Sequence, residues 1–429
     1  MHTAATRFSG KLLIEKIPGR GYALFIALLP VLMMYQVPAV GIGVSTAMII
    51  AGSFYAAAVI FQNLLKHQGK FCIAKILVSF ILYLLYVMAK SAGDTVNMIQ
   101  TLLIIVHIIA FSTGAVSPEH LKKYIVAISV LACTLTIVQS VFHYTLGVHI
   151  PCIAPSLCLD SLQYYKSAIL TGYQAVSSLY RPSAFFLEPS HLTQYAFVAL
   201  LLCLFHGKKQ LPAAVCISMG MVATTSGMGI MLAAGIWGLF GLNQIRRANF
   251  SGKIVRIMGY ALALTAVFLF LCQFAFFRSA LERIFSPVQY SQDSYNAIWG
   301  RTLYWDAYIA PMSGSQLLFG FGYAQLPEEY FTGLMELIYC SGLLGVVLYY
   351  FAMLTTALRC KCVPRITSVL LCGLMLVANT TSLISMTYYI GILLVFGLET
   401  GTEPADSLPA PARPESSAIS GKHAERIAP

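Results

Sequence analysis

The chain has 429 residues, of which 58% are hydrophobic and only 10% charged, and its mean hydropathy is +0.76. This is more apolar surface than one water-soluble core buries, so the composition excludes a soluble globular domain and predicts a lipid-embedded bundle. The net charge of +11 does not indicate a nucleic-acid partner, because the basic residues stand singly and in pairs between apolar runs. These runs match the ~20 residues that a helix needs to cross ~30 Å of hydrocarbon, and a crossing backbone must bond within itself. An all-α polytopic membrane protein is therefore expected.

The N-terminal end carries basic residues before the first apolar run, without a small-residue cleavage site. We expect this end to be retained in the cytoplasm and not removed as a signal peptide. These basic residues are Arg7, Lys11, Lys16 and Arg20.

About twelve membrane segments are predicted in chain order. They lie near 21–37, 39–63, 72–90, 95–115, 123–146, 190–206, 211–225, 227–243, 257–277, 331–355, 366–382 and 384–398. The break at 224–226 leaves an alternative, since 211–243 also fits one long helix or a re-entrant pair. The division near Ser382 carries the same alternative, so the count is 10–12.

The orientation follows from the loops, because short cytoplasmic loops collect Lys and Arg. The twelve-segment arrangement places five basic clusters on the N-terminal side: Lys66 and Lys70; Lys122 and Lys123; Lys208 and Lys209; Arg246, Arg247, Lys253 and Arg256; Arg359, Lys361 and Arg365. Both termini are then cytoplasmic. Residues 1–401 form the membrane domain, and residues 402–429, rich in Pro, Ala and Ser, are a predicted disordered cytoplasmic tail.

The eleven cysteines show no metal-binding spacing. Seven lie in apolar segments, where a thiol behaves as a small hydrophobe: Cys72, Cys133, Cys203, Cys216, Cys272, Cys340 and Cys372. Cys152 and Cys158 share an outside loop in which a disulfide is allowed, whereas Cys360 and Cys362 should stay reduced in the cytoplasm. His107, in the middle of the fourth segment, is expected to be a hydrogen-bonded packing residue and not a proton carrier.

Two long connections, 147–189 and 278–330, lie outside in this arrangement, and long loops are usually functional or disordered. Their aromatic content argues against disorder. The aromatic residues are Tyr164, Tyr165, Tyr173, Tyr180, Tyr290, Tyr295, Trp299, Tyr304 and Trp305.

The stretch 180–191 ends the first of these loops and holds Arg181, Glu188 and His191. Pro189 suits the first turn of a helix, so Glu188 is either an N-terminal cap or a functional carboxylate. The guanidinium of Arg181 fits a lipid phosphate or an anionic substrate, and its forked geometry favours the substrate.

The second outside loop holds Arg301, Tyr304 and Trp305, followed by Gly320-Phe321-Gly322. Arg301 also has a simpler interpretation as an ion pair with Asp306. Glu336 is predicted about two turns inside the tenth segment, where a carboxylate is costly. It is there either as a functional group or as the partner of an arginine that holds two helices together.

The order of these features resembles the O-antigen polymerase (Wzy-type) and O-antigen ligase superfamily across roughly residues 170–350. The resemblance rests on short motifs in the expected order: Arg181…Phe186-x-Glu188-Pro189, the Thr225-Ser226-Gly227 break, Gly300-Arg301…Trp305, Gly320-x-Gly322 and Gly342-x-x-Gly345.

The resemblance implies a C-type glycosyltransferase architecture and a metal-independent enzyme without a cofactor. The implied reaction transfers a glycan carried on undecaprenyl pyrophosphate to the next lipid-linked repeat unit at the outer membrane face. Arg181 and Arg301 correspond to the family's outside-loop arginines, with Arg278 and Arg283 expected to assist. Glu188 either orients Arg181 or acts as general base. A chain-length regulator and a flippase of the same pathway are the implied partners.

One departure favours a polymerase over a ligase. Ligases carry a histidine followed by asparagine about eleven positions before the final glycine pair, where this chain has Phe331 and Thr332. A ligase-like transferase remains the alternative within the superfamily. The product also stays open between capsule, exopolysaccharide and the O-antigen of lipopolysaccharide.

The rival class is a secondary transporter or flippase of lipid-linked oligosaccharide, since twelve segments with both ends inside are also common in transporters. Transporters usually place ionisable groups near the midplane. Here the candidate residues concentrate outside, which favours chemistry at one membrane face.

Overall fold

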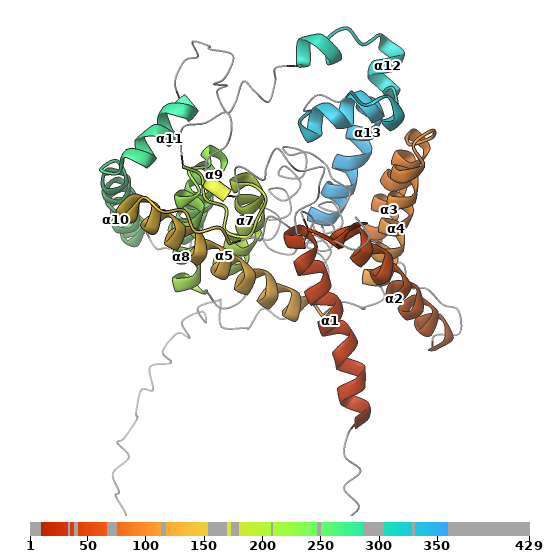
Figure 1. The fold of residues 1–429 in the computed structure, drawn as a ribbon, viewed down its shortest axis with the longest axis horizontal. Coiled ribbons are helices and arrows are strands. Elements are labelled where there is room, and N and C mark those ends of the chain that lie inside the picture. Colours follow the sequence, from red (N-terminus) through yellow and green to blue (C-terminus); the bar gives the residue numbers. More distant parts are fainter. Residues whose placement is uncertain are drawn as a thin grey trace, which may run out of the picture.

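The computed structural model describes residues 10–32, 35–37, 42–66, 75–112, 117–152, 170–172, 180–206, 209–246, 250–285, 304–327 and 331–358 (Figure 1). These residues are almost entirely helical, apart from a short antiparallel pair of strands and the connecting turns. Arg301, the predicted segments 366–382 and 384–398 and the predicted tail lie outside the described residues.

Ten of the predicted membrane segments correspond to a helix. These helices are α1 (Gly10–Leu32), α2 (Val44–Lys66), α3 (Lys75–Lys90), α4 (Thr95–Ser112), α5 (Pro118–Leu146), α7 (Pro189–Phe205), α8 (Leu211–Ala223), α9 (Gly227–Arg246), α10 (Phe250–Leu271) and α13 (Gly333–Ala357). Four of them, α5, α9, α10 and α13, have the length and apolar composition to cross a membrane, and each of the others contains a shorter apolar helical stretch of 10–17 residues. The chain is therefore a helical membrane protein.

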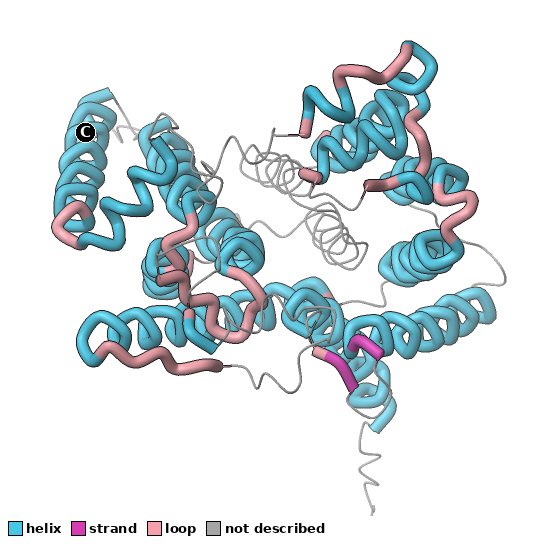
Figure 2. Tube along the Cα trace, turned by 45° about the horizontal axis from the view of Figure 1, so that its top comes forward, coloured by secondary structure: helices cyan, strands magenta, loops and turns pink. Residues whose placement is uncertain are grey.

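Several predicted boundaries differ from the structure, including the start of α1 at Gly10 and not near residue 21, and two of the differences change the path of the chain. The first two segments do not nearly touch, because α1 ends at Leu32 and a hairpin of β1 (Gln36–Val37) and β2 (Ile42–Gly43) precedes α2. Figure 2 shows this pair in magenta beside the helices. Pro38 explains the extended backbone, since proline cannot donate to a helix and disfavours helical geometry in the residue before it.

The second wrong boundary is the end of the segment predicted at 257–277. Helix α10 ends at Leu271, and after a turn the chain enters α11 (Ala275–Phe285). The predicted outside loop then contains the π-helical turn η4 (Trp305–Ile309), the short helix α12 (Gly314–Phe319) and the 3-10 turn η5 (Tyr323–Gln325). The sequence of α11 places charged residues among its aromatic ones, which suits a helix at a membrane boundary better than one inside the hydrocarbon.

The helices pack in two groups joined by α1. Helices α5, α7, α8 and α9 pack together, with α10 against α9, while α3 contacts both α4 and α13 and α2 packs on α4. Helix α1 contacts α5 on one side and α2 on the other, as Figure 1 shows at the centre of the molecule.

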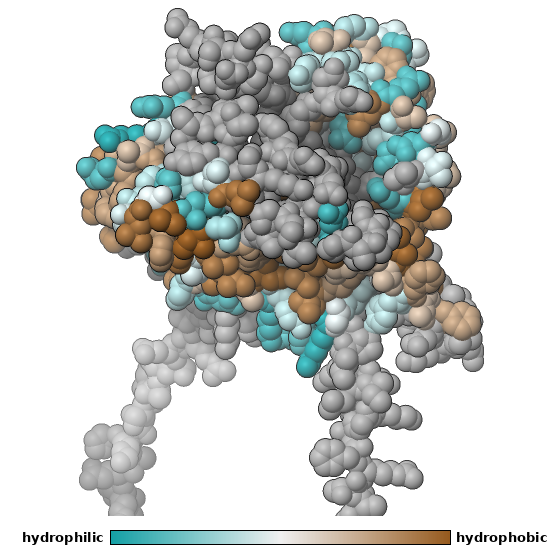
Figure 3. Space-filling view, viewed as in Figure 1, coloured by the Kyte–Doolittle hydropathy of each residue, from teal (hydrophilic) through white to brown (hydrophobic). Residues whose placement is uncertain are grey.

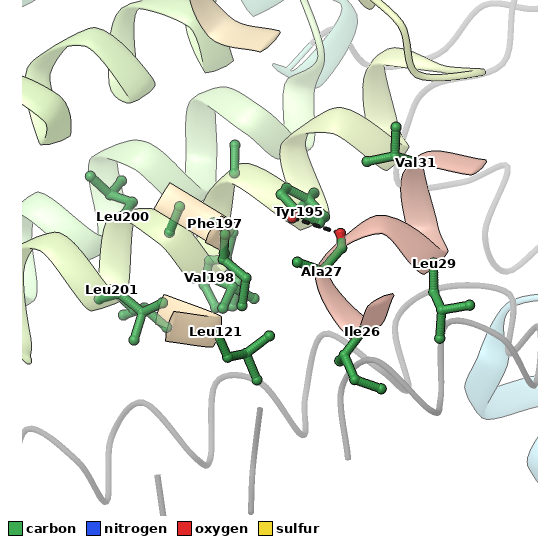
Figure 4. Packing of buried hydrophobic residues seen from close by; sticks show 14 of the residues in the cluster. Ile26, Ala27, Leu29, Val31, Leu121, Tyr195, Phe197, Val198, Leu200 and Leu201 are labelled. Carbon is green, nitrogen blue, oxygen red and sulfur yellow. Dashed lines mark hydrogen bonds between the residues drawn. The ribbon is translucent and has the colours of Figure 1, made fainter. Parts of the chain in front are cut away.

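Helix α7 forms the centre of the first group, and most of its side chains are buried. The Tyr195 hydroxyl donates to the carbonyl of Ala27 at 2.9 Å and so ties α7 to α1 (Figure 4). By contrast, the apolar side chains of α10 are exposed, and Figure 3 shows brown apolar side chains gathered in a belt across the visible face. Lipid is the expected neighbour of these exposed chains.

His107 is a hydrogen-bonded packing residue, as predicted. It is fully buried in α4, where its Nδ1 atom pairs with the Tyr22 hydroxyl and its Nε2 atom lies 3.0 Å from Oγ of Ser53. The imidazole thereby joins α1, α2 and α4 in the interior, where an unpaired polar group would be costly.

The break after α8 produces two helices and not one. The Trp237 indole donates to the Ser218 hydroxyl at 2.8 Å, whereas the two residues would be roughly 28 Å apart in a straight helix at about 1.5 Å per residue. Thr225, at the turn, has a φ of 54°. The single-helix alternative is therefore wrong for this region, and two antiparallel helices fit both the predicted pair of segments and a re-entrant pair.

Helix α13 contains a kink at Gly342, where φ is 66° and ψ is −174°. The kink frees carbonyls that a continuous helix would bond internally, and the loop before α13 occupies them. The amide of Phe321 donates to the Tyr339 carbonyl at 2.8 Å, and the amide of Gly322 donates to the Cys340 carbonyl at 2.9 Å. The Ser341 carbonyl accepts from the Tyr86 hydroxyl of α3 at 2.8 Å. The glycine motifs therefore have a structural explanation.

Gly320→Ala and Gly342→Ala should each destabilise the protein by about 2 kcal/mol or more, because both positions have left-handed backbones that favour glycine. A Cβ on Gly320 would lie 2.4 Å from the carbonyl carbon of Cys340, and one on Gly342 would lie 2.4 Å from that of Leu318. Thermal unfolding in detergent measures the loss. Gly259→Ala in α10, where a Cβ meets nothing within 4 Å, is the control and should not destabilise the protein, since alanine is favoured over glycine inside a helix by up to about 1 kcal/mol. Equal melting temperatures for all three variants would contradict this account.

Candidate functional site

Tyr180 anchors the end of the first predicted outside loop to the C-terminal end of α5. Its side chain is 2% exposed, and its ring stacks on His143 with centroids 3.7 Å apart. The hydroxyl lies 2.7 Å from Nδ1 of His149 and donates to the carbonyl of Gln139 at 3.3 Å. The Tyr180 carbonyl accepts from the Thr225 hydroxyl at 3.0 Å, so the turn between α8 and α9 is attached to the same residue.

Gln139 of α5 connects two points near the ends of the same loop. Its Nε2 donates to the carbonyl of Ile150 at 2.7 Å, and its Oε1 accepts from the amide of Ala184 at 3.0 Å. Ala184 has a φ of 51°, so the amide is presented by an unusual backbone conformation. One buried amide side chain thereby fixes both the chain leaving α5 and the chain approaching α7.

Arg181 follows the anchor directly. Its backbone amide donates to the carbonyl of Gly172 at 2.8 Å, its side chain is half-buried, and its Nε atom is buried. Gly172 has a φ of 74°, and a Cβ there would lie 2.2 Å from the Tyr180 ring, so only glycine fits beside the ring. The guanidinium thus starts from a backbone whose place is fixed, as a site for an anionic group requires.

Glu188 occupies the N-terminal cap position of α7, but its carboxylate makes no capping hydrogen bond, so the first of its two predicted roles is not observed. Instead, Oε2 accepts from the Ser190 hydroxyl at 2.7 Å. Pro189 is the first helical residue, as predicted. His191, in the same turn, is within electrostatic range of Glu188, and its Nδ1 atom is buried. The carboxylate is therefore not occupied by helix capping.

Arg278 and Arg283 lie on α11 and not in an irregular loop. Arg278 is exposed, and the side chain of Arg283 lies outside the described residues. Helix α11 approaches the anchor through Phe276, whose ring stacks on Tyr144 of α5 at 5.5 Å between centroids, and Tyr144 meets the Tyr180 ring at 6.0 Å. The end of the first predicted outside loop and the start of α11, which leads into the second, therefore meet at the C-terminal end of α5.

Tyr304 and Trp305 have different environments. The Tyr304 ring packs with Tyr308 and Phe331, at centroid distances of 6.1 and 6.5 Å, and so belongs to an aromatic cluster that supports α13. Trp305 is 37% exposed and open to a ligand. Arg301, just before them, lies outside the described residues, so neither its pairing with Asp306 nor its distance from Arg181 is described.

Glu336 lies in the first turn of α13, and its predicted place two turns inside the helix was wrong. The helix begins only at Gly333, because the Thr332 hydroxyl caps it by accepting from the amide of Met335 at 3.4 Å. A carboxylate in this turn is favoured by the helix dipole, which lowers the cost of placing it there. Glu336 is within electrostatic range of Tyr323 of η5, whose phenol pKa is raised well above its usual value, mainly by burial.

The described cysteines from the predicted apolar segments differ in burial, and Cys216 and Cys272 are only half-buried. Cys133, Cys203 and Cys340 are buried. Cys152 is a free thiol whose pKa is raised by burial, and Cys158 lies outside the described residues. Within the part of the chain that the structure describes, no three His, Cys, Asp or Glu side chains form a group that could hold a metal ion.

The structure thus arranges the described site residues in two groups. Arg181, Glu188 and His191 lie between the anchor and the start of α7, near α11, whereas Tyr304, Trp305 and Glu336 lie at the N-terminal end of α13. Sequence reasoning missed most of the residues that hold each group in place. For the first group these are Gln139 and His149, while Thr225 was singled out only as a helix break and its bond to Tyr180 was not foreseen. For the second group they are Tyr86 and Lys90, whose ammonium donates to the Gly320 carbonyl at 3.2 Å. The signal in the sequence that could have identified Gln139 was its place as an isolated glutamine near the end of the apolar segment 123–146.

No family model matches the chain, and no curated protein matches it significantly.

Gln139→Leu should destabilise the protein by about 2 kcal/mol, because it removes two hydrogen bonds worth about 1 kcal/mol each. It should also raise hydrogen exchange at the amide of Ala184, which loses its acceptor. Mass spectrometry of peptides covering 180–188 measures the exchange. Gln273→Leu, at an exposed glutamine that donates only within its own turn, is the control and should change neither property. Unchanged exchange at Ala184 would refute the anchoring role of Gln139.

Proposed function

We propose that the chain is a bacterial membrane polysaccharide polymerase. It transfers a growing glycan from undecaprenyl pyrophosphate to a sugar hydroxyl of the next lipid-linked repeat unit, at the outer face of the plasma membrane. The observation that carries the proposal is the fixed segment between Tyr180 and α7. It holds a half-buried arginine and a carboxylate free of capping at one end of an apolar helix bundle.

The chemistry needs a group that accepts the charge of the leaving pyrophosphate. In the transfer, the bond between the anomeric carbon and the pyrophosphate oxygen breaks, and the acceptor oxygen bonds to that carbon while losing its proton. Arginine suits the first task, because its planar fork donates two hydrogen bonds to phosphate oxygens as negative charge gathers there. Arg181 takes this role, with Arg301 as its proposed partner and Arg278 and Arg283 at the edge of the site.

The proton of the acceptor hydroxyl requires a base, and Glu188 fits this role. Its Oε2 accepts a single short bond from Ser190, and no bond to a helix amide competes for it. Glu188 is also within electrostatic range of His191 in the same turn of α7. In the proposed reaction Glu188 takes the proton, while Trp305 offers an exposed ring for stacking on a sugar.

The substrate's lipid tail needs a route along apolar surface. Helix α10 exposes its apolar side chains, and it continues through a short turn into α11, which carries Arg278. A polyprenyl chain beside such helices places its pyrophosphate at the level of these arginines. The mechanism requires no metal ion.

The residues that replace the ligase histidine motif support a polymerase over a ligase. Phe331 is 3% exposed in the aromatic cluster, and Thr332 caps α13, so both positions have structural tasks. Against a transporter, the buried His107 has both ring nitrogens hydrogen-bonded, and Glu336 lies at a helix end and not at its middle. A chain-length regulator and a flippase remain the proposed partners, and both termini are proposed to be cytoplasmic.

The decisive experiment uses the purified protein and lipid-linked repeat units in detergent or vesicles. A polymerase produces a ladder of glycan lengths without nucleotide sugar or added metal. A ligase-like enzyme transfers glycan only to a different acceptor, and a transporter produces no ladder.

Arg181→Ala should lower the rate of elongation by roughly 10²–10³-fold, the usual loss when one donor to a developing anion is removed. Arg301→Ala should do the same, and Arg181→Lys should also be impaired, since an ammonium lacks the planar fork. The control is Arg256→Ala, whose guanidinium donates to the Gln244 carbonyl at 2.7 Å on the predicted cytoplasmic side. Ladder length on gels measures the effect, and near-normal chains in both alanine variants would contradict the site.

A further inference from the structure

We propose that Tyr180 is a positioning residue, which fixes Arg181 for contact with the donor pyrophosphate. This inference rests on the proposed function. Its basis is the peptide unit between Tyr180 and Arg181, which is hydrogen-bonded on both edges. The carbonyl accepts from Thr225 at 3.0 Å, and the amide of Arg181 donates to Gly172 at 2.8 Å.

A peptide unit held on both edges sets the direction of the next side chain. The unit is planar, so two bonds on opposite edges leave it little freedom to rotate. Because the plane fixes where the Cα atom of Arg181 lies, it also limits where the guanidinium reaches. The two bonds come from different parts of the chain, the turn between α8 and α9 and the segment at 170–172, so neither can shift alone without straining the other.

The Tyr180 side chain holds this unit against α5. The ring lies between His143 and His149, and the hydroxyl bridges His149 and the carbonyl of Gln139. Gly172 leaves the ring just enough room, since a Cβ there would overlap it. A phenylalanine would retain the stacking on His143 but lose both contacts of the hydroxyl, so the hydroxyl is the part of Tyr180 that a single substitution tests.

A fixed arginine matters for the proposed reaction because catalysis depends on placement. A misplacement of about 1 Å can cost roughly a hundredfold in rate even when the chemical groups are all present. Without the contacts of the Tyr180 hydroxyl, Arg181 is still present, but its guanidinium samples more positions. The expected loss lies in turnover, with binding of the lipid-linked substrate largely retained.

The test compares Tyr180→Phe with Tyr195→Phe. Tyr195 is also 2% exposed and donates its hydroxyl to a backbone carbonyl, that of Ala27 at 2.9 Å, but it belongs to the packing between α7 and α1. In Tyr180→Phe we expect kcat for elongation to fall about tenfold with KM within twofold, and hydrogen exchange at the amides of Arg181 and Ala184 to rise. In Tyr195→Phe we expect neither change.

A double-mutant cycle separates positioning from general stability. With Arg181→Lys already present, Tyr180→Phe should have little further effect on kcat, because the group that it positions is gone. If Tyr180→Phe does not fold, Thr225→Val and Thr225→Ser test the same peptide unit. Valine should lower kcat and raise exchange at Arg181, and serine, which keeps the hydroxyl, should restore both.

The positioning role is overturned if Tyr180→Phe and Tyr195→Phe have equal kcat and equal exchange. It is also overturned if the fold losses in kcat of Tyr180→Phe and Arg181→Lys simply multiply in the double variant. In either case the wild-type protein still makes its ladder, so the proposed function stands. A wild-type protein that makes no ladder overturns the proposed function itself, and the positioning role of Tyr180 with it.

Discussion

The constraint on which this structure depends is that backbone polar groups within an apolar bundle must find partners in the protein. Within the part of the chain that the structure describes, helical geometry breaks at Thr225, in the turn between α8 and α9, and at Gly342 within α13. Each interruption binds a segment from a predicted outside loop. Thr225 holds the carbonyl of Tyr180, and the carbonyls before Gly342 accept from Phe321 and Gly322. The breaks therefore determine where the loops dock.

This arrangement gives the two outside loops different kinds of support. The first is held through side chains, chiefly Gln139 and Tyr180, whose bonds reach α5 and the turn after α8. The second is held through its backbone, which requires close approach and therefore glycine at 320 and 342. A polymerase would benefit from both, since its arginines need a fixed backbone beside a membrane in which the lipid-linked substrate diffuses.

The polar side chains discussed above occupy two kinds of position, the bundle interior and the ends of helices. His107 is buried and has hydrogen-bond partners on both ring nitrogens, which is the pattern of a packing group that joins helices. Arg181, Glu188 and Glu336 are half-buried and lie at or just before helix starts. Such positions allow charge without the full cost of the hydrocarbon interior.

The sequence by itself determined the helical membrane class, ten of the helices and the break near Thr225, because hydropathy and helix-breaking residues are local properties. It also identified His107 as a packing residue. Only the tertiary structure decided that Glu188 leaves its helix uncapped, that Glu336 lies in a first turn and that Tyr180 anchors Arg181. These outcomes depend on which backbone carbonyls and amides lack a hydrogen-bond partner within their own segment and on which distant segments supply one. No single stretch of sequence contains that information.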